Sequence, residues 1–158
     1  MKTHLILPSI LGIALGLASG IATAADAPPA ETNWLSTLNL SSIEQGWGEA
    51  HPDRSVNNEK LTVAGRVFER GIGTHAHSSI PLEVDGNALV LSGWAGLDDE
   101  TEGRGSVLFQ IQADGKELWN SGIMRPKDAA KEFSLDVKGV KSLVLVAADA
   151  GDGNDWDS

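Results

Sequence analysis

After Trp34 the apolar residues alternate with polar ones in short runs, and this alternation constrains the fold more than any other feature. A period of two places the apolar side chains of a β-strand on one face, whereas no run shows the spacing of an amphipathic helix. The alternating positions are Leu61 and Val63; Ile80, Leu82 and Val84; Leu89 and Leu91; Val107, Phe109 and Ile111; Phe133, Leu135 and Val137; and Leu143 and Leu145.

Turn signals separate these runs. Asp114-Gly115 stands between two of them and suits the positive φ angles of a two-residue hairpin turn. Residues 85–87 and 138–140 separate two further pairs of runs. We therefore predict roughly seven or eight short strands, with no helix between them, in two antiparallel sheets packed face to face. The fold class is an all-β sandwich of the jelly-roll type.

The first residues are typical of an export signal. Lys2 precedes a stretch of apolar and small residues from Leu5 to Ile21, and Ala22 and Ala24 fit the small-residue positions of a cleavage site. We expect a signal peptide at 1–24, a flexible leader at 25–33 and one domain at 34–158. The alternative for the first segment is a retained membrane anchor. Export places the protein outside the cytoplasm: secreted, periplasmic or on the cell surface.

Charge and composition exclude several classes of function. The formal net charge is −10, which disfavours nucleic acid as a partner. The chain has no Cys, so disulfides, thiolate metal sites and thiol nucleophiles are excluded. It also has no Tyr, so any aromatic platform for a sugar must come mainly from its five Trp residues.

Several phrases occur together in one order: GWG at 46–48, GIGTHAHS at 71–78, GLDDE at 96–100, GSVLFQIQADGKELWNSG at 105–122 and DAGDGNDWD at 149–157. With these phrases the chain resembles the NPCBM family, the novel putative carbohydrate-binding module, also called carbohydrate-binding module family 51. The resemblance implies a β-sandwich that binds galactose-type or related glycans, commonly with a structural calcium ion, and is often attached to glycoside hydrolases. Family members typically continue past the last phrase into a closing strand, so we expect this domain to be C-terminally truncated and to lack that strand; the alternative is that it closes differently.

Candidate sugar contacts follow from what a pyranose needs, an aromatic plane and polar groups that replace the hydration of its hydroxyls. Trp47 and Trp94 are expected near loops, whereas Trp34, Trp119 and Trp156 are expected in packing roles. On a strand His75 and His77 would share a face; His75 suits a packing role and His77 a ligand contact. Together with possible donors, the predicted carbohydrate-binding residues are Trp47, His77, Trp94, Arg104 and Asn154.

Two acidic loops offer oxygen ligands for a hard cation. The predicted metal ligands are Asp98 and Asp99 in the first loop, and Asp149, Asp152 and Asp155 in the second. Calcium takes six to eight oxygens, so both loops would have to converge on a single ion. Neither loop matches the EF-hand pattern, and solvated turns are an equal alternative. Calcium is therefore expected only as a possible structural ion.

Catalysis is not expected. Neighbouring carboxylates such as Asp98 and Asp99 point to opposite sides of an extended chain, whereas a glycosidase needs two carboxyl groups flanking one bond. The leading hypothesis is a non-catalytic glycan-binding module, with a glycan ligand and a catalytic domain of a larger protein as partners. The first alternative is a structural or protein-interaction sandwich that has lost sugar binding. The second is a hydrolase.

Overall fold

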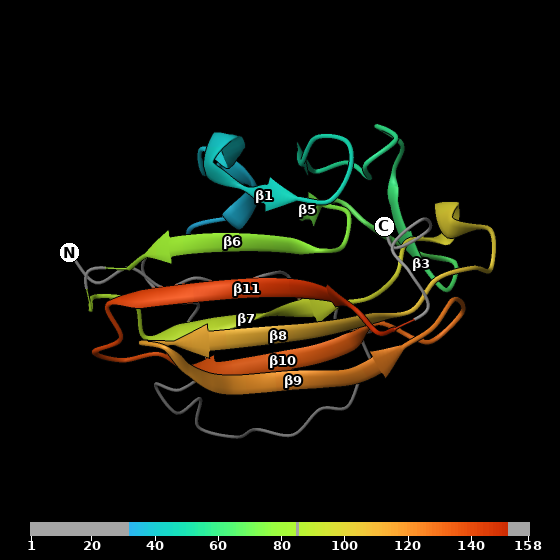
Figure 1. The fold of residues 1–158 in the computed structure, drawn as a ribbon. Helices are drawn as coiled ribbons and strands as arrows, with labels where there is room; N and C mark the ends of the chain where they lie inside the picture. Colours follow the sequence, from blue (N-terminus) through green and yellow to red (C-terminus); the bar gives the residue numbers. More distant parts are fainter. Residues whose placement is uncertain (1–31, 85, 152–158) are drawn as a thin grey trace, which may run out of the picture.

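The computed structural model describes residues 32–84 and 86–151 and shows an all-β fold (Figure 1). The predictions for residues 1–24, and for nearly all of the leader, lie outside these ranges. The strands are β1 Glu44–Gln45, β2 His51–Pro52, β3 Leu61–Val63, β4 Arg66–Phe68, β5 Ile72–Gly73, β6 Ser78–Glu83, β7 Val90–Ala95, β8 Val107–Ala113, β9 Lys116–Met124, β10 Lys131–Asp136 and β11 Ser142–Asp149. Single 3-10 turns are η1 Leu35–Thr37, η2 Leu40–Ser42 and η3 Asp99–Thr101.

The long strands form the two predicted antiparallel layers. One sheet has the order β1-β6-β11-β8-β9, and the other pairs β10 with β7. The register aligns apolar positions across strands, because Leu145 of β11 lies opposite Ile80 on one side and Ile111 on the other. Such rows are what a period of two produces when one face of a sheet is buried. The prediction of an antiparallel sandwich is confirmed.

The core fills the space between the two layers. Its main cluster joins Leu91 of β7 and Phe133 of β10 to Ile111 and Leu143 of the larger sheet. The ring of Trp119 in β9 lies 5.2 Å from that of Phe133, so the indole packs inside the sandwich as expected. A second cluster surrounds Met124, which is fully buried.

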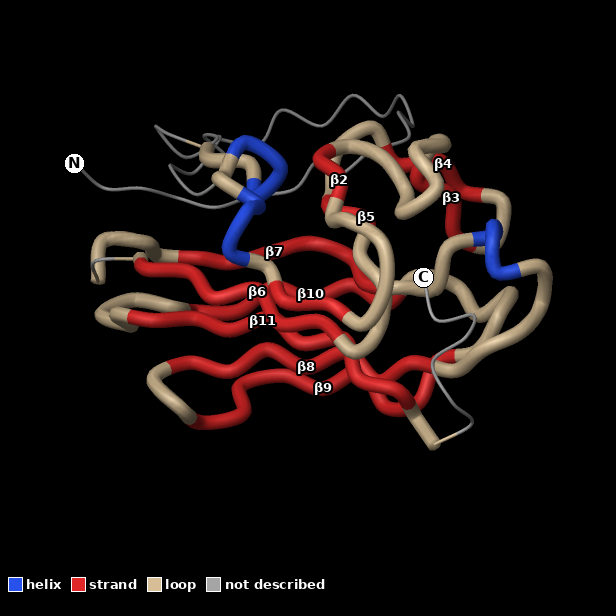
Figure 2. Tube along the Cα trace, turned by 45° about the horizontal axis from the view of Figure 1, so that its top comes forward, coloured by secondary structure: helices blue, strands red, loops and turns tan. Residues whose placement is uncertain are grey.

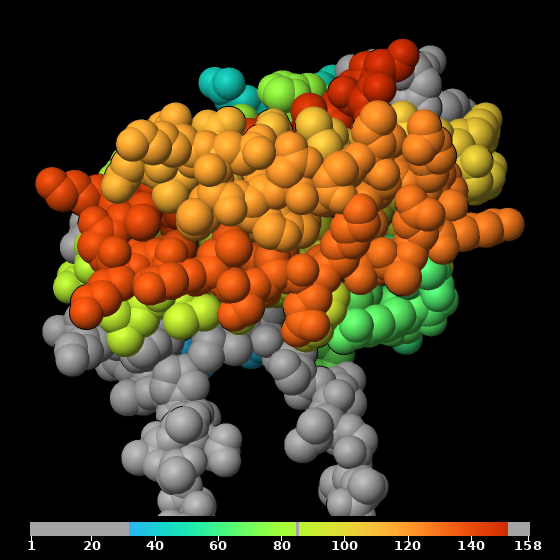
Figure 3. All heavy atoms as spheres, turned by 90° about the horizontal axis from the view of Figure 1, so that it is seen from below, coloured from blue at the N-terminus to red at the C-terminus, as the bar shows by residue number. Residues whose placement is uncertain are grey.

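At the lower side of the molecule β9 and β10 bring the two sheets together. Figure 3 shows this side as a closed surface built from the segments that contain these strands. The Nζ atom of Lys131 donates a hydrogen bond to the carbonyl of Ser121, which bridges the two sheets. A bulge in β9, where Gly122 has a φ of +66°, interrupts the regular edge. Bulges and lysines are common at sheet edges because they oppose pairing with a further strand.

The hairpin at Asp114-Gly115 is confirmed. Ala113 pairs with Lys116, and the two residues between them have φ angles of +47° and +77°, as a type I′ turn requires. The Asp114 carboxylate also accepts hydrogen bonds from the backbone N–H groups of Lys141 and Ser142, and these bonds, the largest influence, lower its pKa. The hairpin is thereby tied to the start of β11.

The structure contains more strands than we predicted, eleven within the described ranges instead of seven or eight. The additional strands are short: β1, β2 and β5 have two residues each, which is too few to show a period of two. Figure 2 shows β2 to β5 gathered with loops above one end of the long strands. None of the helices in the described ranges combines the length and apolar character needed to span a bilayer.

Candidate functional site

Trp47 is the aromatic side chain that the fold exposes most clearly. It lies in the bend between β1 and β2, and 59% of its surface is exposed, the largest fraction among the large apolar residues described as exposed. Gly48 follows with a φ of +69°, and a Cβ at that position would lie 3.0 Å from Val56. The bend thus needs glycine directly after the indole, which explains the second glycine of the GWG phrase.

The GIGTHAHS segment runs beside this bend. Gln45 pairs with Ser78 in the β1–β6 ladder, so the residues just after β1 lie next to the residues just before β6. The Oγ1 of Thr74 donates to the Oε1 of Gln45 at 2.8 Å, and the Nε2 of Gln45 donates to the carbonyl oxygen of Trp47 at 2.6 Å. These bonds join the two motifs, and we call the residues around Trp47 the Trp47 platform: Gln45, Trp47, Thr74 and the buried His75, with the exposed His77 next along the segment.

The two histidines of this segment have different environments. His75 is 4% exposed; its Nδ1 lies 2.6 Å from the carbonyl oxygen of Ala76, and its ring meets that of Trp47 edge-on with centroids 5.7 Å apart. His77 is exposed. The expectation that they share a strand face is wrong, because residues 74–77 form no strand and β6 begins only at Ser78. The packing role inferred for His75 agrees with its burial.

Glycine allows this segment to approach its neighbours closely. A Cβ on Gly73 would lie 2.2 Å from the carbonyl oxygen of Arg54 and 2.6 Å from the Cα of Ser55. Real Cβ atoms do not approach backbone atoms that closely, so a larger residue at 73 would push the segment away from residues 54–55. The glycines of GIGTHAHS therefore determine where His75 and His77 lie.

Trp94 has a different setting from Trp47. It lies in β7 opposite Glu132, and since Gly93 and Phe133 on either side of this pair are buried, the pair points to the outer face of the smaller sheet. The guanidinium of Arg66 lies 4.5 Å from the indole centroid. One face of Trp94 is therefore already occupied, and this makes it a poorer platform for a pyranose than Trp47.

The remaining predicted sugar contacts do not join the platform. Arg104 lies in the loop after η3, where its Nη2 is 3.1 Å from the Oε2 of Glu102. Both of these side chains are substantially exposed, so the pair contributes little to stability. Asn154 lies outside the described residues. The roles assigned to both stay predictions.

The carboxylates of Asp98 and Asp99 bind backbone amides. Asp98 accepts from the N–H groups of Thr62 and Glu100, at 2.8 and 3.0 Å, one on each oxygen. Asp99 accepts from Ala64 and Gly65, at 2.9 and 2.8 Å, again one on each oxygen. Burial is the largest influence on Asp98 and raises its pKa. The two residues therefore attach the β3–β4 hairpin to η3.

The calcium prediction stays a prediction. Within the described ranges no group of three His, Asp or Glu residues is arranged to hold a metal ion. Asp149, at the end of β11, accepts a hydrogen bond from the N–H of Gly151 at 2.8 Å. Asp152 and Asp155 lie outside the described residues, so the convergence of the two acidic loops is untested.

A cavity of about 190 Å³ lies between the sheets, but it does not suit a sugar. Most of its lining is apolar and includes Ile111, Phe133 and Leu145, whereas Trp47 and His77 do not line it. A pyranose carries hydroxyl groups that lose their hydration on burial and need hydrogen-bond partners in exchange. The exposed Trp47 platform provides both an aromatic plane and polar side chains, so it is the better candidate site.

Comparison with known proteins identifies the family. Residues 31–158 match the model of the NPCBM/NEW2 domain. An α-1,3-galactosidase B of Akkermansia muciniphila is 43% identical over 123 residues, a match that covers 75% of this chain and 15% of the galactosidase. The chain therefore corresponds to a small part of that relative.

Solved structures give the same result. The CBM51 domain of a Clostridium perfringens GH95 protein, solved in complex with methyl-galactose, has a TM-score of 0.73 and 30% identity, covering 79% of this chain and 92% of that one. A structure of the CBM51-2 and INT domains of Clostridium perfringens ZmpB, with GlcNAc bound to CBM51-2, has a TM-score of 0.72 and 31% identity, covering 78% and 28%. From its motifs, its sandwich and these matches, the chain belongs to the NPCBM/NEW2 domain family of carbohydrate-binding modules.

Proposed function

We propose that this chain is a non-catalytic module that binds a galactose-type sugar on the Trp47 platform. The observation that carries the proposal is the exposed indole of Trp47 between two motifs that hydrogen bonds hold together. The CBM51 domain solved with methyl-galactose, which is similar over most of both chains, supports the choice of sugar.

The platform offers the two kinds of contact that a galactoside requires. The indole of Trp47 can stack against the apolar C–H face of the ring. His77, which is exposed two residues from the buried His75, and the amide of Gln45 can exchange hydrogen bonds with hydroxyl groups at the ring edge. His75 contacts Trp47 edge-on and positions the indole rather than binding the sugar.

We further propose that the module acts outside the cytoplasm and serves a larger glycan-active protein. The export signal predicted at residues 1–24 supports the first point, and the galactosidase of which this domain matches a small part supports the second. Binding to a glycan would hold an attached catalytic domain near its substrate. Tethering of this kind raises effective concentration without adding a chemical step.

A titration series tests the sugar site. The mature chain is titrated with methyl β-galactoside, and with methyl N-acetylglucosaminide as a second sugar, by isothermal calorimetry. We expect the galactoside to bind and Trp47→Ala to weaken binding by roughly tenfold or more, whereas Trp94→Phe, which keeps a ring beside Arg66, leaves it unchanged. Binding that survives Trp47→Ala but is lost in Trp94→Phe would move the site to the other tryptophan, and preference for the second sugar would correct the ligand.

A further inference from the structure

A second feature lies away from the Trp47 platform, where the β3–β4 hairpin meets β7 of the smaller sheet. Arg66 and Phe68 both belong to β4, and as residues i and i+2 of a strand they share one face. The guanidinium lies 4.6 Å from the Phe68 centroid and 4.5 Å from the Trp94 centroid. The two ring centroids are 6.1 Å apart and the rings are inclined at 47°, so the guanidinium lies against both rings without being sandwiched between them. We call Arg66, Phe68 and Trp94 the arginine stack.

Hydrogen bonds to the β3–β4 turn hold Arg66 of this stack in place. The β3–β4 hairpin turns at Ala64-Gly65, whose φ angles are +49° and +78°, directly before Arg66. Both turn amides donate to the carboxylate of Asp99. Arg66 therefore follows a turn that is attached to η3, and its guanidinium lies against two aromatic rings. A guanidinium ordered in this way loses little entropy on binding a ligand.

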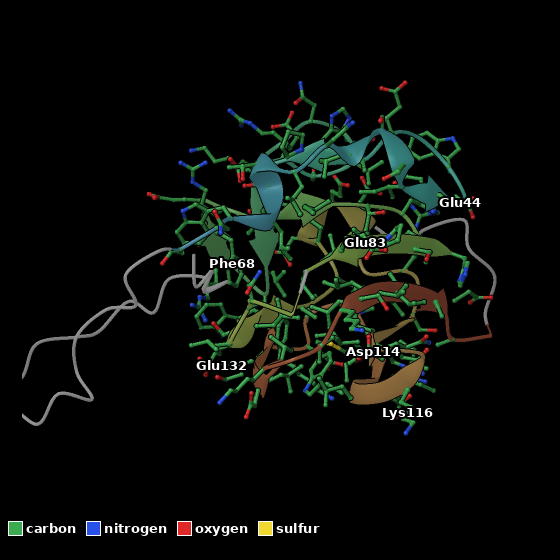
Figure 4. All side chains as sticks on the ribbon, turned by 90° about the vertical axis from the view of Figure 1, so that its left-hand side faces the viewer. Glu44, Phe68, Glu83, Asp114, Lys116 and Glu132 are labelled. Carbon is green, nitrogen blue, oxygen red and sulfur yellow. The ribbon has the colours of Figure 1, made fainter. Side chains whose placement is uncertain are left out.

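Among the described residues no carboxylate forms an ion pair with Arg66. The ion pairs found there join Arg70 to Asp53 and Arg104 to Glu102, and Arg66 takes part in neither. The nearby carboxylate of Asp99 is already occupied by the two turn amides. Glu132, opposite Trp94, shares its face of the sheet but lies beyond the 4.0 Å range of an ion pair with Arg66. Figure 4 shows Phe68 and Glu132 on one side of the molecule and Glu44, where β1 begins, on the other.

We propose that the arginine stack binds an oxyanion substituent of a glycan, a sulfate ester or a carboxylate. The two rings approach the guanidinium from directions roughly at right angles to each other, so its far side, with the N–H groups there, is not covered by either ring. A planar fork of donors matches the paired oxygens of a carboxylate or a sulfate in bidentate fashion. The proposal rests on the proposed function only in taking the carrier of this anion to be a sugar.

The test observes both sites at once by nuclear magnetic resonance. The ¹⁵N-labelled mature chain is titrated with methyl β-galactoside, its 6-sulfate, and the methyl glycoside of N-acetylneuraminic acid. The signals followed are the Nε–H of Arg66 and the indole N–H groups of Trp94 and Trp47. We expect at least one charged sugar to shift Arg66 and Trp94, and the neutral galactoside to shift Trp47 alone. The two charged arms show whether sulfate ester or carboxylate is preferred.

Variants separate binding from packing. Arg66→Gln removes the charge and the fork, and we expect roughly a tenfold or greater loss of affinity for the charged sugar, the usual effect of a charge-assisted hydrogen bond. Arg66→Lys keeps the charge without the fork and should also bind more weakly. Arg125→Gln, at an exposed arginine outside the stack, removes the same charge and should leave affinity unchanged.

Three results would overturn the proposal: no shift of the Arg66 signal with either charged sugar, equal weakening by Arg66→Gln and Arg125→Gln, or full affinity in Arg66→Gln. Failure here is distinguishable from failure of the Trp47 platform. A charged sugar that shifts Arg66 while no sugar shifts Trp47 contradicts the proposed function and leaves the arginine stack supported. If the galactoside shifts Trp47 while no charged sugar shifts Arg66, the proposed function is supported and the arginine stack is contradicted as a binding site.

Discussion

Replacing Asp99 by alanine tests how the loop before β8 supports the rest of the fold. The variant removes two acceptors, to which the N–H groups of Ala64 and Gly65 donate at 2.9 and 2.8 Å. Because the side chain is exposed, each hydrogen bond is expected to contribute an energy in the lower part of the usual range. The free energy of unfolding should therefore fall by about 1–2 kcal/mol in total. For a domain of this size that corresponds to a fall in Tm of roughly 3–8 °C.

Asp99→Asn gives an intermediate case. The amide keeps one acceptor oxygen but presents an NH₂ group to the second N–H donor, so about half of the loss is expected. Glu102→Gln changes the charge in the same loop and touches no turn amide; it should change the free energy of unfolding by less than about 0.5 kcal/mol. Calorimetry measures all three, and hydrogen exchange reads the protection of the Ala64 and Gly65 amides directly.

The same variants test the predicted calcium ion. If Asp99 only holds the hairpin, the loss caused by Asp99→Ala is the same in excess calcium and in a chelator. A loss of stability that disappears in the chelator would show that Asp99 stabilises the protein as a metal ligand. It would refute the view that Asp99 acts only by binding the turn amides of Ala64 and Gly65. Unchanged protection of the Ala64 and Gly65 amides in Asp99→Ala would refute it as well.

Three further predictions concern Gly73, Asp53 and the start of the mature chain. Gly73→Ala should lower the free energy of unfolding by about 3 kcal/mol or more, because its Cβ would lie 2.2 Å from the carbonyl oxygen of Arg54. Gly115→Ala, whose Cβ meets nothing within 4 Å, should lower it by only about 1 kcal/mol, because of its positive φ. Denaturant unfolding compares the two variants, and equal losses would contradict the clash at Gly73. Burial pushes the pKa of Asp53 upward, but the nearby hydroxyl of Ser36, the hydrogen bond from the Gly71 N–H and the charge of Arg70 together lower it. The ionised Asp53 therefore stabilises the fold above its unfolded pKa of 3.8, and this contribution is lost as pH falls through its lower folded pKa. The difference in Tm between wild type and Asp53→Asn should accordingly shrink below about pH 4. A difference that stays constant down to about pH 2 would refute this. Intact-mass measurement of the exported protein should show a chain that begins at Ala25, and a retained Met1 would contradict cleavage after Ala24.

The sheets could be predicted from the sequence because burial leaves a periodic trace. The strands β6 to β11 are long enough to alternate several times, and Asp114-Gly115 carries the turn chemistry of its hairpin. The short strands β1, β2 and β5 leave no such trace. Residues 74–77 illustrate the limit, since a bend between two strands separates His75 from His77 although their spacing suits a shared face.

The candidate sites depend on partners that lie far away in sequence. Asp98 and Asp99 have the composition of a cation loop, but the amides that they bind outside η3 belong to residues 34 to 36 positions earlier. The arginine stack was missed for the same reason. The sequence spacing of Arg66 and Phe68 suits a shared strand face, but the sequence does not show that Trp94 approaches them. The sequence placed Trp47 and Trp94 alike near loops, and only the structure shows that Trp47 is the more exposed of the two.

The central claim is that the exposed indole of Trp47 holds a galactose-type sugar, and a calorimetric titration of Trp47→Ala with methyl β-galactoside tests it most directly. Because 59% of the side chain is exposed, its removal should leave Tm nearly unchanged while the affinity falls by roughly tenfold or more, the usual worth of an aromatic contact that stacks on a ligand. A folded Trp47→Ala variant that binds methyl β-galactoside as tightly as the wild type would contradict the account.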